Sequence, residues 1–498
     1  MSVRRLITVL GVLLPGAALA EDGPEFAVYS DLAGRAEQVS PYSIDDDGTV
    51  LESDPTINGQ AIVGGDARLS SGIFRVAVFG ELGLHSGALT GQPTVEGIDM
   101  PQTEASDIVL RRANARLSAG RFVTVGGGVM SSDWGLGLLA NSGRRAWEPG
   151  SARFSDPREG DVVLRGLIAT GPHTDKGIVL AGFIDRVYDD DLLVGEDEAW
   201  QTGGSLSVGP PQQRDKPWGG VYALYRQQTA DDGDVTTLSG ADLAARLPIA
   251  LSKTMQLTLE GEGAFITGQT DLGPSPDYPV HDVLQLGGAL RASLDAGPLG
   301  GVFDLLYASG DQNIDDGALN AFRVDPNYEF GMLAFRHVLA AQTGRAPITA
   351  GDPDLVGVPS EDLDRIPTRG SVTNTVALFP RMWGRPYKEL EVYGGPLFIW
   401  NEVPLVDAKN TRLAGGVPTN ALGGASGRYM GTELDLGVRL PIDIAGSRLI
   451  AGAEGAVFLP GSGLEGGEVL PETVYGGRLM LRYLFGYTGP DGGIRGDL

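Results

Sequence analysis

Apolar and polar residues alternate one by one along most of this chain, in segments of strand length. Residues 475–487 show the pattern clearly: the odd positions are apolar, aromatic or glycine, and the even positions include Arg478 and Arg482. A side-chain repeat of two is that of a β-strand and not of a helix. The segment exceeds the roughly 9–11 residues that a tilted strand needs to cross a bilayer, and aromatic residues stand near both ends. A half-buried strand of a soluble β-sandwich is the alternative.

Alternating segments of this kind recur along the whole chain. They lie at 24–34, 60–70, 73–85, 107–117, 121–130, 159–170, 176–188, 199–208, 218–228, 235–247, 253–267, 281–295, 299–309, 371–379, 388–400, 428–440, 447–459 and 475–487. Their number, about 18, is even and within the range of single-chain bacterial barrels. The sequence therefore predicts an all-β fold, a transmembrane antiparallel β-barrel.

Charged residues occupy every second position of several segments. In 428–440, Leu434 and Leu436 alternate with Glu433, Asp435 and Arg439. A charged side chain needs water or a partner on its own side of the sheet. In a membrane barrel we expect that side to face the lumen.

The lengths of the connections predict the orientation of the barrel. Short connections at 70–72, 118–120, 296–298 and 443–446 are typical of periplasmic turns, and long ones at 86–106, 131–158 and 401–427 are typical of extracellular loops. Both chain ends then lie on the periplasmic side.

The connection 310–370 is the longest, and we expect it to carry a helix at 327–341. Asp325 can cap this helix, Pro326 fits its first position, and apolar residues recur at spacings of three or four. The helix can fold into the lumen and constrict it, or lie over the mouth of the barrel. An additional pair of strands is the third possibility. The residues expected to form the constriction are Phe330, Leu333, Arg336 and His337.

Residues 1–20 have the pattern of a secretory signal peptide. Arg4 and Arg5 precede an apolar run, 6–14, and Ala18-Leu19-Ala20 provides small residues for cleavage. The run is too short for a membrane helix, and we expect none in the mature chain. The expected organisation is a signal peptide at 1–20, a barrel at 21–487 and a C-terminal periplasmic tail at 488–498.

The formal net charge is −26, and the chain contains no cysteine. So acidic a chain will not bind nucleic acid through its overall charge. Disulfides and cysteine-ligated metals are excluded. Packing and backbone pairing must hold an exported fold of this kind.

Arginines and carboxylates share the polar face of the expected strands. The expected pore-lining residues are Arg75, Arg112, Arg116, Arg165, Arg246, Arg291, Arg439, Arg448, Arg478, Arg482, Glu260, Glu262, Glu433, Asp435 and Glu454. The guanidinium fork suits bidentate contacts with carboxylate or phosphate groups. These charges can pair across strands and stiffen the wall, or form a path for an anionic solute.

Runs of aspartate fall in the expected loops. They can be solvated, or bind divalent cations that bridge loops or lipopolysaccharide phosphates. Residues 43–54 approach the pattern of a calcium loop, and Asp45, Asp47 and Asp54 are candidate ligands, although Ser43 replaces the usual first aspartate. Structural calcium is the cofactor that the sequence suggests.

Signals for catalysis are weak. The four histidines, His85, His173, His281 and His337, lack metal-ligand spacing. The chain has no Gly-x-Ser-x-Gly elbow on a strand-to-helix turn. We do not expect an enzyme.

Two blocks resemble known bacterial proteins. Residues 120–122, through Trp134-Gly135-Leu136-Gly137-Leu138 to Gly143, are similar to a segment of poorly characterised outer-membrane barrels. Residues 322–335, with Asp325-Pro326-Asn327-Tyr328, are similar to a second block of the same group. The plan of about 18 strands, an arginine-lined lumen and a constricting loop resembles the alginate-export porin family. That resemblance implies outward passage of an acidic polysaccharide.

These patterns favour an outer-membrane channel for a hydrophilic solute, possible cargoes being anions and polysaccharides. A non-conducting structural or surface-interaction barrel is the alternative, and a soluble periplasmic β-protein is a third class. The expected partners are outer-membrane lipid, lipopolysaccharide, the barrel-assembly machinery and the solute. The final residue of a barrel is usually aromatic, so Tyr487 is the expected insertion signal, followed by the tail.

Overall fold

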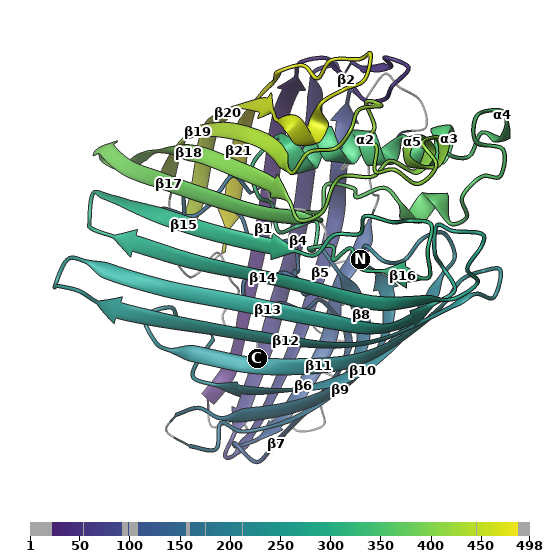
Figure 1. Cartoon of the computed structure of the whole chain (residues 1–498). Coiled ribbons are helices and arrows are strands. Elements are labelled where there is room, and N and C mark those ends of the chain that lie inside the picture. Colours follow the sequence, from purple (N-terminus) through teal and green to yellow (C-terminus); the bar gives the residue numbers. More distant parts are fainter. Residues whose placement is uncertain are drawn as a thin grey trace.

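The computed structural model describes residues 22–52, 54–91, 98, 108–155, 160–174, 176–211, 213–444 and 446–486, and it shows a closed antiparallel β-barrel (Figure 1). Eighteen long strands form the wall. They are β1 (Asp22–Val39), β4 (Thr56–Ser71), β5 (Phe74–Thr90), β6 (Val109–Ala119), β7 (Val123–Met130), β8 (Val162–Thr170), β9 (Val179–Asp189), β10 (Glu198–Val208), β11 (Trp218–Thr229), β12 (Val235–Ala250), β13 (Gln256–Thr270), β14 (His281–Asp295), β15 (Leu299–Ala308), β17 (Thr375–Tyr387), β18 (Leu390–Asn401), β19 (Tyr429–Ile444), β20 (Ser447–Pro460) and β21 (Val474–Phe485). β1 pairs with β21, from Ser30 opposite Phe485 to Val39 opposite Gly476, and this pairing closes the barrel.

The expected fold is confirmed, since each of the 18 expected segments overlaps one wall strand. The largest difference is β17, expected at 371–379 but formed by Thr375–Tyr387. Pro380 and Pro386 favour an earlier end of this strand in the sequence-based prediction, because proline has no N–H to donate to the hydrogen bonds between strands. The strand continues past Pro380 because the ladder to β18 skips that point, from Leu378 opposite Phe398 to Met382 opposite Gly394.

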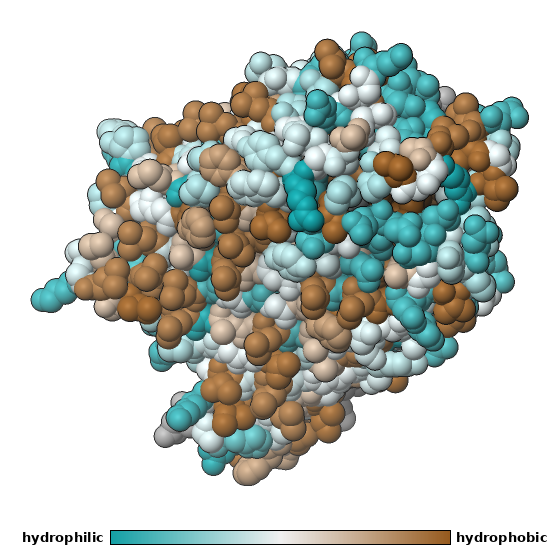
Figure 2. All heavy atoms as spheres, in the orientation of Figure 1, coloured by the Kyte–Doolittle hydropathy of each residue, from teal (hydrophilic) through white to brown (hydrophobic). Residues whose placement is uncertain are grey.

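The two faces of the wall differ in the way the alternation predicts. On β19, Leu434 is 56% exposed and Leu436 is 63% exposed, whereas Glu433 and Asp435 are 0% and 1% exposed and face inward. Figure 2 shows apolar residues gathered on the outer faces of the strands and hydrophilic residues gathered around the long connections. An apolar outer band with polar residues inside is the pattern of a membrane barrel.

Short and long connections lie at opposite ends of the barrel. The end with the short connections, such as Gly72-Ile73 and 445–446, is called here the turn end, and the other the loop end. The short elements are β2 (Tyr42–Ser43), β3 (Val50–Leu51), β16 (Ala318–Leu319), the π-helix η1 (Ala334–Leu339), α2 (Ala340–Gly344), α3 (Ala346–Thr349), α4 (Pro353–Val356), the 3-10 helix η2 (Leu363–Arg365), α5 (Ala408–Leu413) and the 3-10 helix η3 (Ser462–Leu464). In Figure 1 the helices lie toward the upper right, at the loop end.

The helix of the longest connection starts later than expected. Its first residue is Ala334, so Asp325 does not cap it and Pro326 is not its first position. The Asp325 carboxylate instead accepts the backbone N–H of Asn327, which forms a local turn, and Gly331 follows with a φ of +83°. An additional strand pair is wrong, because no wall strand lies between β15 and β17 in the described chain.

Within the described ranges, no helix is both long enough and apolar enough to cross a membrane. The expected signal peptide, Tyr487 and the tail at 488–498 lie outside the described residues.

Candidate functional site in the barrel lumen

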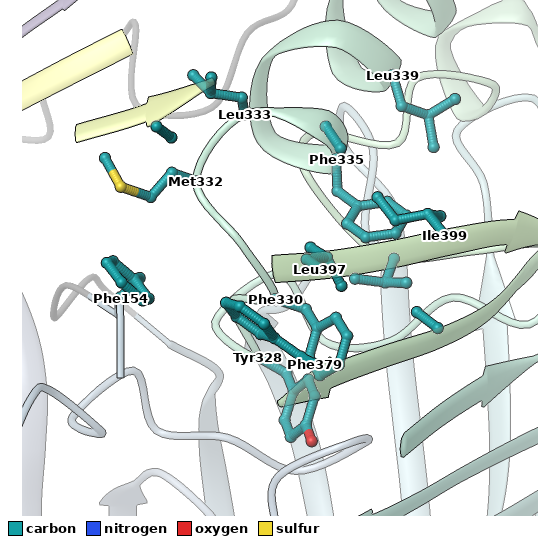
Figure 3. Packing of buried hydrophobic residues seen from close by; sticks show 14 of the residues in the cluster. Phe154, Tyr328, Phe330, Met332, Leu333, Phe335, Leu339, Phe379, Leu397 and Ile399 are labelled. Atoms are coloured by element: carbon teal, nitrogen blue, oxygen red, sulfur yellow. The ribbon is translucent and has the colours of Figure 1, made fainter. Parts of the chain in front are cut away.

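Two connections from the loop end fold into the lumen. The first lumen loop is the described part of the connection from β7 to β8 (131–155 and 160–161), and the second lumen loop joins β15 to β17 (309–374). Their apolar residues pack on the inner wall in one cluster, in which Phe330 and Phe154 contact Phe379 at centroid distances of 5.6 and 6.1 Å (Figure 3). The interior of the barrel is therefore partly a packed core and partly open.

Glu262 of β13 holds the start of the first lumen loop. Its carboxylate accepts the backbone N–H groups of Leu136, Gly137 at 2.9 Å and Leu138 at 3.0 Å. Gly135 has a φ of +47°, and a Cβ there would lie 2.5 Å from the Glu262 Oε2 atom. Glycine is required because a side chain would be strained in this conformation and would clash with the carboxylate.

Glu433 of β19 holds the second lumen loop in the same way. Its carboxylate accepts the N–H groups of Met332, Leu333 at 3.0 Å and Ala334 at 2.7 Å, at the N-terminus of η1. A Cβ on Gly331 would lie 2.6 Å from Leu397 of β18. Each loop thus pairs a left-handed glycine with a wall glutamate that accepts three successive N–H groups.

The first lumen loop then crosses the barrel to the strands opposite. The N–H of Gly150 donates to the carboxylate of Glu391 on β18 at 2.8 Å. Glu454 of β20 accepts Arg439 Nη2 at 2.9 Å and Arg478 Nε at 2.6 Å, and the same Arg478 donates to the carbonyl oxygen of Phe154 in the loop. These buried charges hold the loop against the wall.

A cavity of about 1700 Å³ lies inside the barrel beside the two lumen loops. It is lined by residues from both ends of the barrel, including Asp362 and Arg365 at the loop end and Asp443 and Arg448 at the turn end. The cavity therefore extends along the barrel and connects the levels of the two mouths.

The expected pore-lining residues divide into two groups. Those that line the cavity are Arg112, Arg116, Arg165, Arg246, Arg448, Arg482 and Glu260. Those that do not are Arg75, Arg291, Arg439, Arg478, Glu262, Glu433, Asp435 and Glu454. Most of the second group lie under the lumen loops, and Arg75 is exposed at the turn end. Their role in solute passage stays a prediction.

The charge of the cavity is opposite to that of the chain. The described residues that line it include fourteen arginines and eleven aspartates or glutamates, although the whole chain carries −26. Several of these arginines are held by carboxylates: Arg165 pairs with Asp185 at 2.7 Å, and Arg482 with Asp31 at 2.8 Å. The ion pairs between neighbouring strands can stiffen the wall, as one interpretation of the sequence predicts. The same charges line the cavity, as the other interpretation, a path for an anionic solute, requires.

One lining arginine has no such partner. The guanidinium of Arg153, in the first lumen loop, makes no hydrogen bond or ion pair within the described chain. Burial and the nearby guanidinium of Arg291 lower its pKa. Three guanidinium groups, those of Arg291, Arg214 and Arg145, act on Arg153 against the single carboxylate of Glu148. The excess of positive charge makes this part of the cavity attractive to anions.

Carboxyl groups gather at the loop end of the cavity. Burial raises the pKa of Asp191 to about 6, against the opposing effect of Arg323. Burial also raises the pKa of Asp362 to about 6, although Arg365 opposes this shift. Both residues line the cavity, so the loop mouth gains negative charge as the pH rises through this value.

The residues expected to constrict the pore lie against the wall. Phe330 and Leu333 are buried, Arg336 pairs with Glu329, and His337 Nε2 lies 3.3 Å from Glu37 Oε1 of β1. None of the four lines the cavity. The interior face is formed instead by Val324 and Asp325 of the second lumen loop and by the first lumen loop.

The expected calcium loop does not form. Asp45 accepts the N–H of Thr49 at 2.8 Å and pairs with Arg345 at 2.9 Å, Asp47 pairs with Lys409 at 3.2 Å, and Asp54 is exposed. The carboxylates are thus directed to cations of the chain. The described residues contain no group of three or more metal-ligating side chains.

Sequence reasoning missed the role of the first lumen loop, which it assigned to the extracellular surface. A signal was present, because 131–158 contains Trp134, Leu136, Leu138, Trp147 and Phe154, more apolar surface than a solvated loop carries. The two blocks that carry the family resemblance turn out to be the two segments held by Glu262 and Glu433.

Comparison with known proteins gives the fold. No protein-family model and no curated protein matches the sequence. Among solved structures, OccAB1 of Acinetobacter baumannii matches with 11% identity over 94% of this chain and 97% of its own, at a TM-score of 0.51. OccD3 (OpdP) and OprD of Pseudomonas aeruginosa, each 11% identical, cover 94% and 93% of this chain and 92% and 95% of their own, at TM-scores of 0.48 and 0.46.

The fold is a closed 18-strand antiparallel β-barrel that is similar to the fold of OccAB1. The barrel predicted from the sequence is therefore confirmed. The resemblance to the alginate-export family stays a prediction.

Proposed function

We propose that this protein is an outer-membrane channel for hydrophilic solutes and that it favours anions. The observation that carries the proposal is the cavity of about 1700 Å³, which reaches from one end of the barrel to the other and is lined by more arginines than carboxylates. In a narrow cavity with low-dielectric walls, the lining charges act on a solute far more strongly than the charges of the outer surface.

Arg153 and Arg246 are the residues that we assign to this preference. The guanidinium of Arg153 makes no hydrogen bond or ion pair in the described chain, and Arg246 donates to the carbonyl oxygens of Pro211 and Gln213 at 3.0 Å. A carboxylate or phosphate of a solute can bind to guanidinium groups of this kind. An acidic polysaccharide, as the resemblance to alginate exporters implies, is one solute of this kind.

Reconstitution in planar bilayers tests the proposal. We expect discrete conductance steps and, under a KCl gradient, a reversal potential that indicates preference for chloride. A protein that inserts without any conductance steps would refute the channel. Conductance with strong preference for potassium would refute the anion path alone.

The non-conducting barrel is the second candidate, because the two lumen loops bury an extensive apolar cluster inside the wall. A channel whose lumen is narrowed by the first lumen loop should conduct more when 134–153 is replaced by a short glycine linker. A barrel that only offers a surface to partners should show no conductance before the replacement.

The membrane orientation also belongs to the proposal. We assign the loop end to the cell exterior, in contact with lipopolysaccharide, and the turn end to the periplasm, where export by the signal peptide and insertion by the barrel-assembly machinery would begin. Protease added to intact cells should then cleave an epitope inserted between Gly415 and Gly416 and not one inserted at Gly297.

A further inference from the structure

Three aromatic side chains gather on one side of the cavity. Trp134 comes from the first lumen loop, and Trp218 and Tyr222 from β11. The ring of Trp134 lies edge-to-face with the other two, at centroid distances of 5.3 Å to Trp218 and 5.2 Å to Tyr222. We call these three residues the aromatic shelf.

The wall is shaped to receive the shelf. A Cβ on Gly220, between Trp218 and Tyr222 on β11, would lie 2.8 Å from the Trp134 ring, so glycine makes room for the indole. Arg145 donates to the carbonyl oxygens of Trp134 and Gly135 at 3.2 and 3.0 Å and fixes the backbone of the loop at this point. The shelf is therefore a fixed part of the lumen and not a mobile side chain.

Hydrogen-bonding groups of both kinds line the cavity that contains the shelf. The ladders place Trp218 opposite Arg246 and Arg246 opposite Glu260, so Glu260 is two strands from Trp218, about 10 Å along the wall. The Glu260 carboxylate lines the cavity and has no hydrogen-bond or ion-pair partner in the described part of the chain. Arg153, the arginine without a partner, lines the same cavity.

We propose that the aromatic shelf is a binding subsite for the pyranose rings of a carbohydrate solute. A pyranose exposes C–H groups on its faces, which aromatic rings can cover, and hydroxyl groups around its edge. A hydroxyl can donate to Glu260 and also accept from Arg153, whereas an aromatic carboxylate would accept from Arg153 but be repelled by Glu260. A lining that offers both a carboxylate, at Glu260, and guanidinium groups therefore favours a sugar over a flat aromatic acid.

The spacing indicates more than one ring. A solute that stacks on the shelf and reaches Glu260 spans about 10 Å, the distance of two strand spacings. This length suits a di- or trisaccharide better than a single ring. The inference rests on the proposed channel function, because the shelf can meet a solute only along the cavity.

Maltotriose is the probe that tests the subsite. We expect it to block the KCl current of the reconstituted full chain, and we expect the half-blocking concentration to rise about tenfold in Trp134→Leu and in Trp218→Leu, the factor that about 1.4 kcal/mol of lost stacking produces. Glu260→Ala should weaken the block as well. Trp200→Leu is the matched control, because Trp200 is 51% exposed on the outer face of β10, and it should leave the block unchanged.

Several outcomes would overturn the subsite. The first is conductance that maltotriose does not block. The second is a block that Trp134→Leu and Trp218→Leu do not weaken, and the third is a block by benzoate but not by maltotriose. Each of these outcomes would refute the subsite and leave the channel proposal intact. If no conductance is seen, the channel proposal fails, and calorimetric titration of the detergent-solubilised barrel with maltotriose still tests the subsite. If the tryptophan variants do not fold, Gly220→Ala, which should displace the Trp134 ring, replaces them.

Discussion

The backbone N–H of Asp325 lies 2.8 Å from the carbonyl oxygen of Leu138, and this hydrogen bond joins the two lumen loops inside the barrel. Eight of the 18 wall strands, β8 to β15, lie between the two residues in sequence. Leu138 belongs to the segment held by Glu262, and Asp325 precedes the segment held by Glu433. The loops therefore form one internal body that is anchored to the wall by Glu262 and Glu433. A change at either glutamate should alter the shape of the cavity.

Removing an anchor should loosen this body. Glu262→Ala and Glu433→Ala each leave three buried N–H groups without an acceptor, at a cost of about 1–3 kcal/mol for each group. We expect larger and noisier single-channel currents and a lower unfolding temperature of the barrel. The matched control is Glu198→Ala on β10, because the Glu198 side chain is 64% exposed and pairs with Arg186 of the neighbouring strand rather than with a lumen loop. Single-channel currents with unchanged amplitude and noise in both variants would contradict the claim that Glu262 and Glu433 hold the lumen loops.

The anchor glycines should tolerate no side chain. In Gly135→Ala the new Cβ meets the Glu262 carboxylate, and in Gly331→Ala it meets Leu397, in both cases at a positive φ that costs about 1–2 kcal/mol by itself. We expect thermal unfolding of both variants at lower temperature, followed by loss of the folded band on unheated gels. Gly263→Ala, with open space at the Cβ position, should match the native chain. Equal stability of all three variants would show that the loops adapt freely.

The anion preference should depend on Arg153. Arg153→Gln removes a cavity charge without leaving a carboxylate unpaired, so the fold should be kept. We expect the chloride-to-potassium permeability ratio, measured from reversal potentials, to fall about two- to fivefold, as the loss of about 1 kcal/mol of attraction predicts. Arg186→Gln, on an outward-facing position of β9, is the control. An unchanged ratio would assign the preference to other arginines.

The preference should also depend on pH. The pKa values of Asp191 and Asp362 are raised to about 6, so both carboxyls are largely neutral at about pH 5 and ionised at about pH 7. The loop mouth thus gains two negative charges, and the chloride-to-potassium ratio should fall as the pH rises. No histidine lines the described cavity to oppose this trend. The double variant Asp191→Asn, Asp362→Asn should reduce the dependence. An unchanged dependence in that variant would show that other groups cause it.

The raised pKa values of Asp191 and Asp362 also make the stability of the protein depend on pH. Because the folded-state pKa is raised, the folded loops bind protons more tightly than the unfolded chain, and their contribution to stability is lost as the pH rises through about 6. The double asparagine variant should therefore be relatively more stable than the native chain at pH 7 than at pH 5, as thermal unfolding at the two values can show.

The last described strand residue should be needed for assembly. Phe485 is 46% exposed on the outer face and lies opposite Ser30 of β1 and Ser447 of β20, where the barrel closes. We expect Phe485→Ser to prevent insertion and Phe485→Tyr to permit it, judged by heat-modifiable mobility of membrane fractions. Normal insertion of the serine variant would assign the signal to the neighbouring Tyr487.

The wall was predictable from the sequence because each strand carries its own signal. Alternation on 428–440 separates Leu434 from Glu433 without reference to any other part of the chain. At 371–379 the predicted strand stops before Pro380, and there the prediction of β17 is too short. The confirmed strand count depends on this local information.

The interior was less predictable because it depends on contacts between distant residues. Nothing near Glu262 or Glu433 indicates that each accepts N–H groups from a loop about 100 residues or more away. The pattern placed both on the lumen face correctly, but it could not show whether they meet solute or backbone. Likewise Phe330 and Leu333 were recognised as apolar residues in need of burial, and only the packing shows that they cover the wall.

Closure of the barrel and seating of the first lumen loop depend on the same strand. β21 supplies both the seam with β1 and the guanidinium of Arg478, which donates to the carbonyl oxygen of Phe154 in that loop. A change that shifts β21 along β1 would therefore also move the donor away from the loop, so the register of the seam and the shape of the interior are coupled.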